Sequence, residues 1–82
     1  MEQKELEFAI EILAENVNYY SREMEKAKRK NLPMIEQSYF SKILGIAEAL
    51  SYLGYSVDGF GRSVDCKDIE SVEYMHYNVS KR

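Results

Sequence analysis

The chain has 82 residues, of which 45% are hydrophobic and 30% charged, and its formal net charge is −3. These values are typical of one small folded domain and exclude an extended disordered chain. The negative charge argues against a general coat for nucleic acid, because attraction to phosphate needs a positive field.

The first predicted helix spans residues 4–30, a stretch without glycine or proline. Its apolar side chains recur at alternating spacings of four and three residues, which places them along one face of a helix. Acidic residues near its start and basic residues near its end complement the helix dipole. The members of the apolar stripe are Leu6, Ile10, Leu13, Val17, Tyr20, Met24 and Ala27.

The second predicted helix spans residues 33–53. Pro33 suits its first turn, where the missing N–H costs nothing, and Gly54 suits the left-handed position just after its end. The link between the two helices is short, so we expect an antiparallel αα-hairpin. The apolar side of the second helix contains Ile35, Tyr39, Ile43, Ile46, Leu50 and Leu53.

After Gly54 the composition shifts to Val, Tyr, Ser and Gly, and residues 55–79 are expected to be mainly extended. Asp58-Gly59 predicts a tight turn between short strands at residues 55–57 and 63–65. Residues 72–79 predict a further strand, with a helix over residues 65–76 as the alternative. The chain is therefore expected to be a single α+β domain, residues 1–82, with a long antiparallel αα-hairpin followed by a short β-hairpin or strand segment.

A second apolar patch lies on the first helix, well away from its main stripe. It consists of Phe8, Ile12 and Tyr19. Two helices cannot enclose a core without a third layer or another chain. We therefore expect self-association through this patch, most simply as a two-fold homodimer. The alternative is that the C-terminal segment folds back over the patch.

Basic side chains crowd the end of the first helix. They are Arg22, Lys26, Lys28, Arg29 and Lys30. Dipole compensation and solvation explain them most simply. The functional alternative is a contact to nucleic acid, in which two such ends of a dimer lie along a duplex. No helix-turn-helix pattern accompanies them.

The stretch Gly59-Phe60-Gly61-Arg62 raises the question of a ligand-binding loop. It matches neither the phosphate loop of nucleotide-hydrolysing enzymes nor the glycine fingerprint of dinucleotide-binding folds. The simplest prediction is a turn. Alternatively, Phe60 stacks on a base and Arg62 pairs with a phosphate, which makes the domain a nucleotide- or anion-sequestering module. Neighbouring aromatic faces then come from Tyr55, Tyr74 and Tyr77.

Candidates for catalysis or metal binding are scarce. Cys66 and His76 are the only soft metal ligands, too few for a zinc site in one chain. No acid–base pair or activated nucleophile can be named, so we expect no enzyme activity, no metal and no cofactor. One cysteine, the lack of a signal core and the lack of a long apolar run favour a cytoplasmic protein with no membrane contact.

The high tyrosine content favours a binding protein, because tyrosine gives a large contact area at low entropy cost. In size and composition the chain resembles the small, acidic, one-domain proteins of bacteriophages and mobile elements in AT-rich hosts. That resemblance implies a regulator or inhibitor of a host system. We therefore expect a small non-enzymatic protein-binding regulator that acts through an apolar and tyrosine-rich helical surface.

Overall fold

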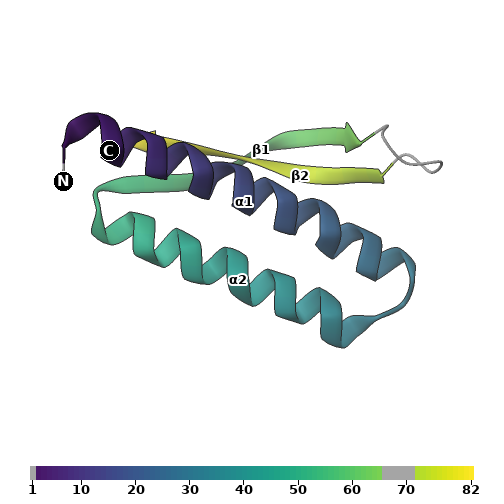
Figure 1. Ribbon diagram of the computed structural model, residues 1–82. Coiled ribbons are helices and arrows are strands. Elements are labelled where there is room, and N and C mark those ends of the chain that lie inside the picture. Colours follow the sequence, from purple (N-terminus) through teal and green to yellow (C-terminus); the bar gives the residue numbers. More distant parts are fainter. Residues whose placement is uncertain (1, 66–71) are drawn as a thin grey trace.

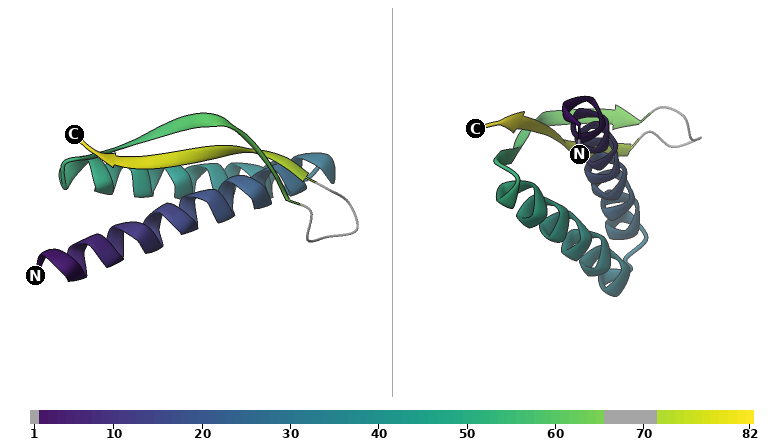
Figure 2. Two further views of the ribbon diagram at one scale, coloured as in Figure 1. Left: turned by 90° about the horizontal axis from the view of Figure 1, so that it is seen from above. Right: turned by 60° about the vertical axis from the view of Figure 1, so that its left-hand side comes forward.

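Two helices precede two strands in the computed structural model (Figure 1), which describes residues 2–65 and 72–82, with only the backbone at residues 60–65. The elements are α1 (Gln3–Arg29), α2 (Pro33–Tyr52), β1 (Tyr55–Asp65) and β2 (Val72–Lys81). The predicted α+β fold is confirmed, and the bounds of both helices lie within one residue of those expected. Both views in Figure 2 place the strands on one side of the helical hairpin.

The reversal between the helices is a Schellman motif. The Leu32 N–H donates to the Ala27 C=O at 2.9 Å, and the Asn31 N–H donates to the Lys28 C=O at 3.1 Å. Asn31 has φ 58°, in the left-handed region that asparagine tolerates better than most residues. The motif satisfies carbonyl groups at the end of α1 and turns the chain directly into Pro33 at the start of α2.

A buried hydrophobic cluster lies where the first half of α1, the second half of α2 and the outer ends of the two strands meet. Ile10, Leu50 and Tyr55 form its centre. Each fully buried aliphatic side chain of this size contributes about 1.5–3 kcal/mol. Partly buried side chains packed around the centre are Leu6, Leu13, Ile46, Val57 and Val79.

The sheet is a single antiparallel pair of strands. Pairing runs regularly from Tyr55↔Lys81 to Gly59↔Tyr77 and resumes at Arg62↔Met75. Two residues of β1, 60 and 61, therefore stand against one residue of β2, which is the arrangement of a β-bulge.

The predicted turn at Asp58-Gly59 is wrong, because both residues pair with β2 inside one continuous strand. The glycine marks the bulge instead of a turn: a Cβ atom on Gly59 would lie 3.2 Å from the Met75 Sδ atom. The strand predicted over residues 72–79 is confirmed and extends to Lys81. The alternative helix is wrong for residues 72–76, and residues 66–71 lie outside the described part of the chain.

Side chains of α1 bind the outer edge of β2. Asn18 donates from Nδ2 to the Tyr77 C=O at 3.0 Å and accepts from the Tyr77 N–H at its Oδ1 atom at 2.8 Å. One turn away, the hydroxyl of the fully buried Ser21 donates to the Met75 C=O at 2.6 Å. These bonds satisfy strand groups that have no neighbouring strand, and they hold α1 beside β2.

Replacement of Asn18 by alanine is expected to lower the free energy of unfolding by about 2–3 kcal/mol, because both backbone groups of Tyr77 lose their partner in a half-buried place. Urea unfolding followed by circular dichroism measures this loss. Asn16→Ala is the matched control, since the half-buried Asn16 side chain makes no hydrogen bond to the described residues. Equal losses in the two variants would contradict this role of Asn18.

Asn31→Gly and Asn31→Ala are expected to change stability in opposite directions. Alanine at φ 58° costs about 1 kcal/mol more than asparagine, whereas glycine adopts this conformation without a steric penalty. Thermal unfolding should therefore give a lower midpoint for the alanine variant and an unchanged or higher one for the glycine variant. A glycine variant less stable than the alanine variant would contradict the strain argument.

Candidate protein-interaction surface

The side of α1 that points away from the core carries three large apolar side chains. Phe8 is 64% exposed, Ile12 42% and Tyr19 43%. At 100° per residue they lie opposite the buried Ile10 and Val17. We call Phe8, Ile12 and Tyr19 the outer face of α1. The described strands of the C-terminal segment do not cover it, because both of them lie on the core side of the helix (Figure 2).

Neighbouring side chains support the tyrosine of this face. The Tyr19 ring meets the Tyr20 ring edge to face, with 5.6 Å between centroids. The Arg22 guanidinium lies 5.4 Å from the Tyr19 centroid, a cation–π distance. Tyr19 is therefore exposed but held in place, and it would lose little conformational freedom on contact with a partner.

The basic residues predicted to contact nucleic acid do not form one patch. Arg22, Lys26 and Lys30 continue the outer face of α1 toward its C-terminal end, whereas Lys28 lies on the opposite side of the helix axis. Arg22, Lys26 and Arg29 also interact within the chain. Three of these basic side chains therefore add positive charge at one end of the outer face of α1. A contact to nucleic acid through the basic residues stays a prediction.

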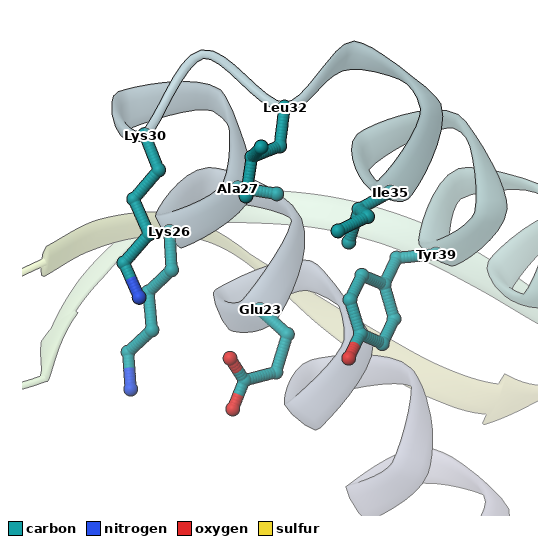
Figure 3. Close-up of a pocket in the computed structure, with 7 residues that line it drawn as sticks. All are labelled: Glu23, Lys26, Ala27, Lys30, Leu32, Ile35 and Tyr39. Carbon is teal, nitrogen blue, oxygen red and sulfur yellow. The ribbon is translucent and has the colours of Figure 1, made fainter.

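A hollow of about 200 Å³ lies at the helix-reversal end of the hairpin (Figure 3). It is smaller than the clefts of roughly 300–1,000 Å³ that usually hold small molecules. In the close-up, the ammonium groups of Lys26 and Lys30 extend to the same side as the Glu23 carboxylate. The residues that line the hollow are Glu23, Lys26, Ala27, Lys30, Leu32, Ile35 and Tyr39.

A tyrosine pair joins the two helices next to this hollow. The rings of Tyr20 and Tyr39 lie 5.9 Å apart, and the Lys42 ammonium lies 5.3 Å from the first centroid and 5.2 Å from the second. Both tyrosines fall on the stripes that the sequence predicts for the core, and both are half-buried. Their role in this arrangement is to fix the helix pair.

Three of the residues expected to surround a nucleotide or anion, namely Tyr55, Tyr74 and Tyr77, are spread along the two paired strands. Tyr55 belongs to the buried core, and Tyr77 lies beside Gly59 on β2. Tyr74 stands opposite Ser63, further along the sheet. The side chains of Phe60 and Arg62 lie outside the described part of the structure. A ligand held between these five residues stays a prediction.

Metal-binding and membrane-spanning features can be assessed for the described residues alone. Among them, no three His, Cys, Asp or Glu side chains are grouped closely enough to hold a metal ion. His76 lies on β2, and Cys66 is outside the described residues. Neither described helix combines the length and the apolar character needed to cross a membrane.

The sequence interpretation missed two features that bear on recognition. Asn18 and Ser21 are polar residues near the apolar stripe of α1. Their position beside buried residues could have indicated that their side chains bind another element, which is β2. Phe40 and Leu44 are 40% and 53% exposed on α2, although their i, i+4 spacing is typical of a buried face. These two residues form a flank of α2 that no described element covers.

Comparison with known proteins gives no relative from which a function could be transferred: no protein-family model, curated protein or solved structure matches this chain significantly. The functional assignment therefore depends on the physical properties of the surfaces described above.

Phe8→Ser combined with Ile12→Ser is expected to leave the free energy of unfolding within about 1 kcal/mol of the original value, because each substitution at an exposed position changes it by about 0.5 kcal/mol. The matched core change, Ile10→Ser on the same helix, is expected to cost roughly 3 kcal/mol or more, since it buries a hydroxyl and opens a cavity. Chemical denaturation of the two proteins measures the difference. A large loss in the outer-face variant would show that the face is part of the core.

Proposed function

We propose that this chain is a small non-enzymatic protein-binding regulator or inhibitor that acts through the outer face of α1. The observation that carries the proposal is the exposure of Phe8, Ile12 and Tyr19 on one side of a long helix, opposite its buried stripe. Such a second apolar side has no use in the fold, because the core needs only one.

The chemistry of this face fits a protein groove. Large aromatic and aliphatic side chains at helical spacing are typical anchors of a helix that lies in a hydrophobic groove. Tyr19 adds a hydroxyl and a ring already fixed by Arg22. Lys26 and Lys30 extend the C-terminal end of the face with positive charge, so the complementary surface is an apolar groove with acidic side chains at that end.

The resemblance in size and composition to small proteins of bacteriophages and mobile elements supports a host protein as the partner class. The single cysteine supports a cytoplasmic setting for that contact. In this proposal the chain blocks or modulates its partner by occupying a groove and performs no chemistry of its own.

Photo-crosslinking in the native cells tests the proposal. Benzoylphenylalanine at position 8 is expected to give a discrete adduct with one partner protein. At position 52, where Tyr52 is 82% exposed at the end of α2, it should not give that adduct. An identical set of adducts from both positions, or none from position 8, would overturn the proposal.

The identified partner then allows a measurement of affinity. Phe8→Ser with Ile12→Ser is expected to weaken binding at least tenfold, which corresponds to about 1.4 kcal/mol or more. Met34→Ser with Tyr52→Ser is the control, because it removes two large side chains from α2 that are even more exposed than Phe8 and Ile12. Equal weakening by the two double variants would contradict a specific role of the outer face.

A further inference from the structure

The two outer edges of the sheet differ in whether their outward backbone groups have hydrogen-bond partners among the described residues. In an antiparallel pair, the N–H and C=O groups of a residue point either both toward the partner strand or both away from it. The Tyr77 groups bind Asn18, so they point away from β1. The pair Gly59↔Tyr77 is therefore a non-hydrogen-bonded pair, and the Gly59 groups point away from β2 as well.

The alternation continues along the regular part of β1. The Arg82 N–H donates to the Gly54 C=O at 2.9 Å, so Gly54 points toward β2, as the alternation from Gly59 requires. Tyr55, Val57 and Gly59 consequently direct their backbone groups outward. No hydrogen bond from another described element reaches these groups, whereas side chains of α1 occupy the corresponding edge of β2.

The open edge lies on the same side of the molecule as the exposed flank of α2. Tyr39 and Lys42 contact Tyr20, which identifies the α1-facing side of α2. Phe40 and Leu44 lie on the other side of the line of buried residues in α2. The strand that α2 contacts most is β1, so this flank borders the β1 edge.

We propose that a second copy of this chain binds at the β1 edge, about a two-fold axis that passes Val57. The result is a four-stranded antiparallel sheet in the order β2-β1-β1-β2. In this register the outward backbone groups of Tyr55, Val57 and Gly59 all form hydrogen bonds. Val57 pairs with its own copy, and Tyr55 pairs with Gly59 of the second copy, each pair exchanging two backbone hydrogen bonds.

Side-chain chemistry favours a second copy as the occupant. The register sets Ser56 opposite the second copy's Asp58, a hydroxyl against a carboxylate, and sets no two like charges opposite each other. One surface thus supplies both halves of the contact, as a two-fold interface requires.

The same axis also accounts for the apolar flank. An added strand lies about 4.8 Å beyond β1 and extends the narrow two-stranded sheet past the Phe40 and Leu44 side of α2. The axis brings the corresponding flank of the second copy to the same place. Both flanks are then covered, which a two-stranded sheet alone does not achieve.

This inference does not depend on the proposed function, because it uses a different surface. The sequence predicts a dimer through Phe8, Ile12 and Tyr19, whereas the β1 edge leaves that outer face of α1 free for another protein. The two surfaces can therefore be tested separately.

Cysteine pairing tests the register directly. In a Cys66→Ser background, Ser56→Cys protein is mixed with Asp58→Cys protein under mild oxidation. The two cysteines form a non-hydrogen-bonded pair with Cα atoms about 4.5 Å apart, within disulfide range, so a mixed disulfide dimer is expected. The control mixes Asp58→Cys with Ser80→Cys, whose exposed site on β2 lies about 10 Å away across the second copy's β1, too far for a disulfide.

Light scattering of the unmodified chain gives the second readout, and a dimer is expected. Phe40→Glu with Leu44→Glu should raise the dimer dissociation constant at least tenfold, while Phe8→Ser with Ile12→Ser should leave it unchanged. A monomer at all concentrations would overturn the inference. So would a dimer in which the Ser56→Cys and Asp58→Cys mixture crosslinks no faster than the control. If only the Phe8 and Ile12 double variant dissociates the dimer, the sequence-based interface is the correct one.

Discussion

The hydrogen bonds between the Asn18 amide and both backbone groups of Tyr77 set the geometry of this fold. An α-helix has no free backbone groups along its length to offer a strand, so its side chains must bind the strand edge, and a side chain with both a donor and an acceptor can bind both groups of one residue. Asparagine supplies both on a short arm. Its reach therefore fixes the distance and the register of α1 against β2, and the core forms below this contact.

The bulge in β1 and the docking of α1 occur at one level of the molecule. Gly59 lies beside Met75, and the carbonyl group of Met75 accepts the hydrogen bond from Ser21. A Cβ atom at position 59 would lie 3.2 Å from the Met75 sulfur, so the Met75 side chain would have to shift by a small distance. The close approach beside a bulge gives a physical reason why a residue typical of turns lies within a strand.

Local periodicity was enough to predict both helices, and the short link at Pro33 was enough to predict their antiparallel reversal. Strand-forming residues predicted β2, although they left a helix over residues 65–76 as the alternative. Local residue patterns were not enough for Asp58-Gly59, because the same two residues suit a tight turn and a bulged strand, and only the distant partners Asn78 and Tyr77 decide between them. The exposure of Phe8 could be inferred from its position on the helix. The contact of Asn18 could not, since it joins residues that are 59 positions apart.

The occupied edge of β2 also limits how this molecule can assemble. A sheet with two free edges can add strands at both sides without end and grow into a fibre. Here the middle of the β2 edge, at Tyr77 and Met75, is covered by side chains of the chain's own helix. In the proposed dimer the two β1 edges pair with each other, and Asn18 and Ser21 cover the middle of each remaining edge. In that dimer these two side chains would oppose the addition of a further strand, which favours a finite complex over a fibre.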